Sequence, residues 1–166
     1  MSALVLLDAG PLGMITNPRG SPDSEACKNW LQGLSQRGIV IAIPEIADYE
    51  VRRELLRAGK TMGWARLDAL KALLRFVPIT SAAMLQAAEF WASARNMGRQ
   101  SASDPSLDAD MILAAQAASL KAVMRNRSLP QLTCAIWPCF AALASGMKSA
   151  REFRPLVSIS SGDFPR

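Results

Sequence analysis

Continuous apolar runs alternate with amphipathic stretches along most of the chain. The runs at residues 3–7 and 39–43 carry no polar side chain, which is typical of strands that are buried on both faces of a parallel sheet. A shorter run at residues 76–79 contains Pro78, and because proline cannot donate to a strand ladder, this strand is expected at an edge. Residues 121–124 are expected to lead into a last strand.

Between these runs, apolar residues recur at helical spacing, and turn residues mark the ends of the helices. Gly38 and Gly59 each follow such a stretch, as expected of helix C-termini, and Pro44 suits the start of a helix. Helices that alternate with fully apolar strands predict an α/β fold, in which a parallel sheet is covered on both sides. The expected helices cover residues 21–38, 44–59, 61–76, 80–98 and 108–120.

Composition agrees with a single compact domain. Half of the 166 residues are apolar, which is enough for a proper core. No run approaches 18 uninterrupted apolar residues and no basic segment precedes an apolar stretch at the start, so we expect neither a membrane span nor a signal peptide. Cys27, Cys134 and Cys139 lack paired spacing, which argues against a disulfide framework or a zinc site. The expected location is the cytoplasm.

The chain contains no histidine, and this absence excludes most common hydrolytic sites. Ser-His-Asp and Cys-His systems, histidine-based ribonucleases and nearly all zinc enzymes need an imidazole. Carboxylates with a hard divalent cation remain the simplest way to activate water. The net charge of +5 hints at nucleic acid, but residues 124–166 hold 6 Lys/Arg against 2 Asp/Glu, so charge alone does not argue for RNA binding.

Asp8 ends the first apolar run, and Gly10 and Pro11 follow at once. In a parallel sheet covered by helices, ligands bind beyond the carboxyl ends of the strands, which is where Asp8 is expected. A buried carboxylate without a partner is costly. We therefore expect Asp8 to meet a cation, a hydrogen-bond donor or solvent.

Four acids share the expected helix at residues 44–59, and Glu50 is the unusual one. At about 100° per residue, Glu50 lies beside Ile43, Ile46 and Ala47, near the side that faces the core. Glu50 is therefore the functional candidate of this helix. The other three are expected in ordinary solvated positions: Glu45, Asp48 and Glu54.

Three acids crowd the start of the helix expected at residues 108–120: Asp104, Asp108 and Asp110. Asp108 suits the N-cap position, and Asp110 would then lie in the first turn, where the helix dipole favours an anion. Capping explains Asp104 and Asp108 at least as well as function does. An apolar ladder follows Asp110, so we expect its side chain to lie against the sheet and to be functional.

Other polar side chains are further candidates. Asn126 follows the last strand signal, where its amide could bind a metal-bound water as a fourth member of the site, although asparagine after a strand usually forms a turn. Arg52 and Arg53 are candidate contacts for RNA phosphates or for a partner protein. Pairing with acids on the same helix explains the two arginines at least as well.

Carboxylates that converge on one point repel one another unless a cation is present. Mg²⁺ and Mn²⁺ take oxygen ligands and keep waters that can attack a phosphodiester. The sequence therefore predicts a Mg²⁺ or Mn²⁺ site to which Asp8, Glu50 and Asp110 contribute.

These acids lie in three motifs that resemble those of the PIN-domain nucleases, especially the branch of VapC-type toxins. Each motif alone is short, but the three occur in the order and spacing of that family. The motifs and their acids are VLLDAGPLG with Asp8, IPEIADYEVRREL with Glu50, and LDADMILAAQA with Asp110 and, beside it, Asp108 as a further ligand.

The resemblance spans roughly residues 3–126 and implies a three-layer α/β/α domain with a central, mainly parallel sheet. It also implies cleavage of RNA with Mg²⁺ or Mn²⁺, frequent homodimers and, in toxin members, a cognate antitoxin. The family pattern continues with Thr-x-Asn or Thr-x-Asp, whereas Met124 stands here in the place of the threonine. We therefore expect a PIN-like domain over residues 1–126, and a C-terminal segment over residues 127–166 that is divergent, irregular or derived from a shifted reading frame.

The leading hypothesis is a metal-dependent endoribonuclease that is the toxin of a toxin–antitoxin pair. Two alternatives stay open. A PIN-like domain with an impaired site would act as a module that binds an antitoxin or a second copy of itself. A different acidic phosphatase or nucleotide hydrolase on a similar sheet would turn over free nucleotides without cleaving RNA.

Overall fold

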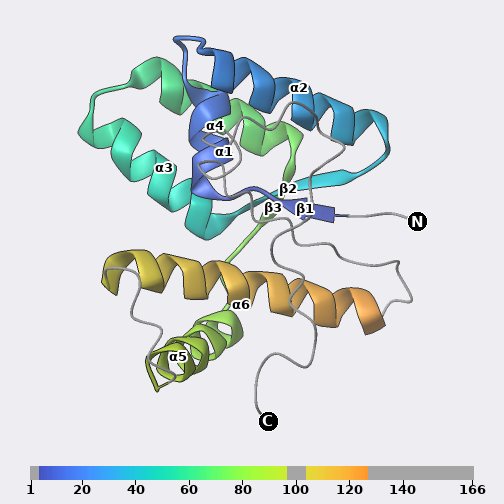
Figure 1. Cartoon of the computed structure of the whole chain (residues 1–166), viewed down its shortest axis with the longest axis vertical. Coiled ribbons are helices and arrows are strands. Elements are labelled where there is room, and N and C mark those ends of the chain that lie inside the picture. Colours follow the sequence, from blue (N-terminus) through green and yellow to red (C-terminus); the bar gives the residue numbers. More distant parts are fainter. Residues whose placement is uncertain (1–3, 97–103, 127–166) are drawn as a thin grey trace.

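A parallel sheet of three strands lies at the centre of the molecule (Figure 1). The computed structural model describes residues 4–96 and 104–126. Strand β2 (Val40–Pro44) lies between β1 (Leu4–Leu6) and β3 (Arg75–Val77) and pairs in parallel with both. The carboxyl ends of all three strands therefore lie at the same edge of the sheet.

Helices cover both faces of this sheet (Figure 1). Helices α1 to α4 form one layer, and α5 and α6 form the other. The predicted fold class, a three-layer α/β/α domain with a central parallel sheet, is confirmed. The helices are α1 (Ala9–Thr16), α2 (Pro22–Gln36), α3 (Glu45–Arg57), α4 (Thr61–Leu73), α5 (Ser81–Asn96) and α6 (Asp104–Asn126).

Each helical layer has its own core, because side chains alternate between the two faces of a strand. Val5 and Leu7 face the α1–α4 layer and belong to the larger core. Leu4 and Leu6 face the other way and belong to the same cluster as Leu120 of α6. Burial on both faces explains why the first strand run has no polar residue.

Most of the local signals at the ends of elements behave as predicted. Ser21 caps α2 by accepting a hydrogen bond from the N–H of Ser24 (3.1 Å). Gly38 (φ 72°) and Gly59 (φ 61°) follow α2 and α3 in the left-handed conformation, which glycine adopts without steric cost. Strand β3 is an edge strand and ends directly before Pro78, as expected.

Helix α1 goes beyond the sequence prediction. The side chain of Asp8 caps its first turn, and Pro11 lies within that turn, where a missing N–H is tolerated. Leu12 and Ile15 bury their side chains in the larger core. The sequence did not predict this helix because two glycines and a proline fall within its eight residues. These residues have low helix propensity and are typical of a turn.

Helix α6 extends beyond its expected bounds at both ends, and this corrects two predictions. The strand signal at residues 121–124 is wrong, since these residues continue the helix. No glycine or proline interrupts the chain between Asp108 and Asn126, and a short apolar run cannot by itself be distinguished from a helix segment. Because α6 begins at Asp104, Asp108 is not its N-cap and Asp110 is not in its first turn.

The predicted C-terminal segment at residues 127–166 lies outside the described residues, as do Cys134 and Cys139. Cys27 is buried and forms no disulfide. In the described ranges, none of the helices combines the length and the apolar character of a membrane-spanning segment.

Candidate functional site

Asp8 lies where β1 ends and α1 begins, at the carboxyl edge of the sheet. Leu7 donates its N–H to the carbonyl of Ala42 on β2 (2.9 Å), which holds this end of the chain against the sheet. The Oδ1 of Asp8 accepts a hydrogen bond from the N–H of Ala9 (2.6 Å). Burial raises the pKa of Asp8, and the hydrogen bond from Ala9 offsets part of that rise. A nearby cation would therefore stabilise the charged form of this half-buried carboxyl.

Glu50 lies on α3 at the border of the core, as predicted. Ile46, one turn earlier, is buried, and the side chain of Glu50 is 23% exposed. Burial raises the pKa of Glu50, and the negative charge of Asp8 raises it further. The charge of Arg53 lowers the pKa of Glu50, whereas that of Asp110 adds to the rise. The charges of both other predicted acids thus raise the pKa of Glu50.

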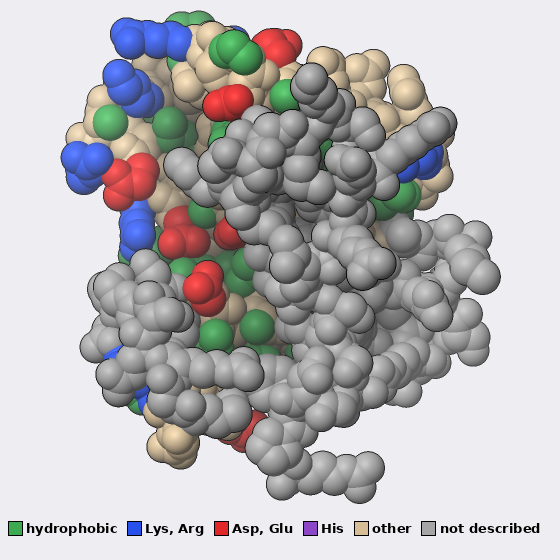
Figure 2. All heavy atoms as spheres, in the orientation of Figure 1, with side chains coloured by type: hydrophobic (Ala, Val, Ile, Leu, Met, Phe, Trp, Pro, Cys, Tyr) green, Lys and Arg blue, Asp and Glu red, His purple; other side chains and the backbone are tan. Residues whose placement is uncertain are grey.

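Asp110 lies on α6, in the helical layer opposite to Glu50. It is exposed as a whole residue, yet partial desolvation raises the pKa of its carboxyl, and the charge of Asp8 raises it further. We call Asp8, Glu50 and Asp110 the acidic cluster. Figure 2 shows acidic side chains gathered in the middle of one face, between the two helical layers.

The acidic cluster has the chemistry of a site for a hard divalent cation. Its members offer carboxylate oxygens alone. Burial raises the pKa of each of them, the charge of Asp8 raises those of Glu50 and Asp110 further, and a cation would offset these effects. Within residues 4–96 and 104–126, no three acid or cysteine side chains form a group that could hold a metal ion as they stand. Carboxylate oxygens are the ligands that Mg²⁺ and Mn²⁺ prefer, so the three acids match these cations by their chemistry, whereas the described residues do not form an assembled metal site.

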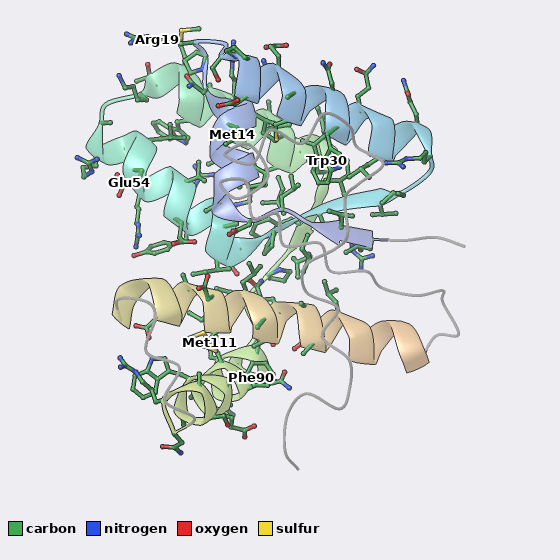
Figure 3. The ribbon with its side chains drawn as sticks, viewed as in Figure 1. Met14, Arg19, Trp30, Glu54, Phe90 and Met111 are labelled. Atoms are coloured by element: carbon green, nitrogen blue, oxygen red, sulfur yellow. The ribbon has the colours of Figure 1, made fainter. Side chains whose placement is uncertain are left out.

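Asp108 faces a different part of the molecule. Together with Met84, Trp91 and Met111 it lines a groove of about 330 Å³ between α5 and α6. Figure 3 shows Met111 and Phe90 on these two neighbouring helices. Asp108 is not among the charges that shift the pKa of any member of the acidic cluster, so the structure does not join it to them.

Asn126 is the last residue of α6 and does not follow a strand. At about 1.5 Å per residue, it lies about 24 Å from Asp110 along the axis of the same helix. Asn126 was predicted as a fourth position because a strand was expected before it. Residues 121–124 are helical instead, so Asn126 does not lie at the end of a strand.

Arg52 is engaged in ion pairs that join α3 to α4. It donates two hydrogen bonds to Asp48 (2.9 and 3.1 Å) and one to Asp68 (2.7 Å), while Lys71 also donates to Asp48 (3.2 Å). Burial alone would raise the pKa of Asp48, but the hydrogen bonds and charges of Arg52 and Lys71 outweigh burial and lower it. The prediction that Asp48 is solvated is wrong: Asp48 is 6% exposed and paired with a side chain of α4.

Arg53 is the cation beside the acidic cluster. Its Nη2 lies 3.8 Å from an oxygen of Glu50, and its guanidinium lies over the ring of Tyr49 (5.5 Å to the ring centre). Its side chain is 49% exposed, so it can contact an anion in solution as well as Glu50. Of the two candidate arginines, Arg53 is the one paired with a member of the acidic cluster.

The sequence prediction missed two polar side chains near this edge of the sheet. Gln116 of α6 is 1% exposed, donates to the carbonyl of Val77 (2.7 Å) and accepts from the N–H of Ile46 (3.4 Å). Glu45, expected in a solvated position, accepts from the N–H of Ile79 (2.5 Å). A single glutamine inside an apolar helical stretch was an available signal for Gln116, whereas no local pattern pairs Glu45 with Ile79.

The sequence pattern of the PIN domain matches residues 5–130, which is most of the chain. The chain therefore belongs to the PIN domain family. None of the curated proteins matches the chain.

Two solved structures have a fold similar to that of this chain. VapBC2 from Rickettsia felis, bound to a DNA fragment from their promoter, matches with a TM-score of 0.58 at 16% identity, covering 81% of this chain and 98% of that chain. VapC20 from Mycobacterium tuberculosis, a toxin that cleaves the sarcin-ricin loop, matches with a TM-score of 0.54 at 16% identity, covering 87% and 96%. The chain is a PIN domain with the fold of these toxins.

Proposed function

We propose that this chain is an endoribonuclease that depends on Mg²⁺ or Mn²⁺ and acts as the toxin of a toxin–antitoxin pair. The observation that carries the proposal is the match of the PIN domain pattern over residues 5–130, a range that contains Asp8, Glu50 and Asp110. The charge of Asp8 acts on both of the other acids. Membership of the PIN domain family and the likeness to VapC20, a toxin that cleaves the sarcin-ricin loop, support RNA as the substrate.

The three carboxylates of the acidic cluster would hold the cation. Asp8 would be one of its ligands, and the charge of Asp8 acts on both of the other acids. When bound, the cation would activate a water for attack on the phosphodiester and neutralise the charge that develops there.

Two side chains on α3 would support this chemistry. Arg53, beside Glu50, binds a phosphate of the RNA and holds the backbone close to the cluster. A pKa above the usual range suits the Glu50 carboxylate to accept a proton during the attack by water.

Mn²⁺ titration and an RNA cleavage assay test the proposal on three proteins: wild type, Asp8→Asn and Asp23→Asn. Asp23 is exposed in the first turn of α2, so its substitution makes the same change of charge away from the cluster. Wild type and Asp23→Asn are expected to bind Mn²⁺ and cleave RNA, and Asp8→Asn to lose cleavage by about 100-fold or more. Equal activity of Asp8→Asn and wild type would remove Asp8 from the site. A wild type that cleaves no RNA with either metal would refute the nuclease.

The proposal includes a small antitoxin and a homodimer as partners. The fold resembles that of VapBC2, and the motifs resemble those of VapC-type toxins, so we infer a protein antitoxin for this chain. Co-expression with any short reading frame found next to its gene, followed by sedimentation of the purified protein, tests both partners. A chain that stays monomeric and retains no such protein would contradict this part of the proposal.

A catalytically impaired PIN domain that binds protein is the second candidate. It is favoured because, in the part of the chain that the structure describes, no three acid or cysteine side chains form a group that could hold a metal ion as they stand. This candidate predicts that calorimetry detects no Mn²⁺ binding by a chain that nevertheless forms a stable complex with a small partner protein.

A further inference from the structure

We infer that Gln116 is a positioning residue, which sets α6, and with it Asp110, at the correct place against Glu50 of α3. The inference rests on the proposed function of the acidic cluster and assigns a role to a residue outside it.

Gln116 is a buried amide in an apolar part of α6. It is 1% exposed, and the residues around it on the helix, Leu113, Ala115 and Ala117, are buried and apolar. Burying an amide without hydrogen bonds is unfavourable, so buried amides normally have partners for both the oxygen and the nitrogen. Both groups of Gln116 are bonded: the nitrogen to the Val77 carbonyl at 2.7 Å, and the oxygen to the Ile46 N–H at 3.4 Å.

Each partner of Gln116 lies at the end of an element. Ile46 is in the first turn of α3, where helix N–H groups have no acceptor within the helix. The N-cap residue of α3, Pro44, makes no side-chain hydrogen bond to that turn. Val77 is the last residue of β3. Gln116 therefore supplies a distant cap for α3 and joins it to the end of β3.

These two hydrogen bonds connect α6 to the opposite helical layer close to the acidic cluster. Ile46 lies one turn before Glu50, and Asp110 lies about 9 Å from Gln116 along the axis of α6. Because helices are stiff over such short spans, the contact between Gln116 and Ile46 sets the separation of Asp110 and Glu50. Ala117 and Leu120 of α6 also pack against the sheet, and such apolar contacts have no preferred direction along a helix.

Two variants of Gln116 and a control on the same helix test this role. Gln116→Leu removes both hydrogen bonds, and Gln116→Glu keeps the acceptor for Ile46 but replaces the amide donor to Val77 by a carboxyl group. The control, Leu113→Ala, destabilises α6 because it removes buried apolar contacts, and it changes no hydrogen bond of Gln116. Three quantities are measured well below the unfolding temperature of each protein: Mn²⁺ affinity by titration, kcat and KM for RNA cleavage, and the hydrogen-exchange rate of the Ile46 amide.

We expect Gln116→Leu to weaken Mn²⁺ affinity by about 10- to 100-fold, the usual effect of removing a residue that orients a metal ligand. Its kcat falls more than its KM rises, and the Ile46 amide exchanges faster. Gln116→Glu keeps slow exchange at Ile46 and has an intermediate affinity. Leu113→Ala unfolds at a lower temperature but binds Mn²⁺ like the wild type.

Equal Mn²⁺ affinities of Gln116→Leu and the wild type would overturn the positioning role and leave the proposed nuclease intact. If Gln116→Leu does not fold, an affinity of Gln116→Glu equal to that of Leu113→Ala overturns the role in the same way. A wild-type chain that binds no Mn²⁺ would overturn the proposed function, and this inference with it.

Discussion

Partial burial raises the pKa of Asp110 on α6, in the smaller helical layer, and the negative charge of Asp8 at the end of β1 raises it further. Burial likewise raises the pKa of Glu50 on α3, and the same charge adds to that rise. Folding thus brings together three acids that would be further apart in an unfolded chain. Their repulsion destabilises the metal-free protein and favours the binding of a cation.

Replacing a member of the cluster by its amide should stabilise the metal-free protein. Asp8→Asn removes the charge that acts on Glu50 and Asp110, and the Asn oxygen can still accept from the N–H of Ala9. We expect the unfolding temperature without metal to rise by about 2–4 °C, as for ~1 kcal/mol in a chain of this size. Thermal unfolding in the presence of a chelator checks this. Asp23→Asn is the control, and its unfolding temperature should not rise. A lower unfolding temperature for Asp8→Asn would contradict the repulsion.

The gain from neutralising Glu50 should depend on pH. The pKa of Glu50 is raised above its ordinary value of 4.5, so the folded chain holds this proton more tightly than the unfolded chain. The destabilisation is therefore complete above the raised pKa and is relieved as the pH falls through it toward about 4.5. Urea unfolding without metal should show that Glu50→Gln is more stable than the wild type at neutral pH, and that this advantage shrinks on acidification. An advantage that grows with acid would have the wrong sign.

Asp48 should show the opposite pH dependence. Its pKa is lowered from 3.8, so its contribution to stability is present above about pH 4 and is lost as the pH falls through the folded-state value. Asp48→Asn should lower the free energy of unfolding by about 2 kcal/mol at neutral pH, because it breaks buried charged hydrogen bonds with Arg52 and Lys71.

Glu54→Gln is the matched control for Asp48→Asn. It breaks an exposed pair with Arg57 (2.8 Å), and such pairs contribute less than about 1 kcal/mol. Urea unfolding compares the two variants. Equal losses would show that burial of Asp48 adds nothing to the strength of its ion pairs.

Arg53 should act on the binding of RNA more than on folding. Arg53→Gln removes the cation beside Glu50, so we expect a higher KM for RNA and a salt dependence of binding that is weaker by about one unit of slope. Arg57→Gln, on the same helix with a side chain that is 75% exposed, is the control. RNA binding measured over a range of salt concentrations distinguishes the two variants, and identical slopes would remove Arg53 from the substrate site.

The sequence by itself determined the layered architecture and the placement of several acids. The first two strands are recognisable because burial on both faces leaves no room for polar residues, and the ends of α2 and α3 because glycine and a capping serine act locally. Asp8 was identifiable for a similar reason, since an acid that ends a buried strand must meet something at the edge of the sheet.

Only the tertiary structure decided which side chains meet. The extent of α6 followed from packing along its length, where a short apolar run is equally compatible with strand and helix. The burial of Asp48 depended on α4, and the partners of Gln116 lie on α3 and β3. Periodicity reports only on neighbours along the chain, whereas a buried polar group is stabilised by partners far away in sequence, so its role becomes visible only once the layers are packed.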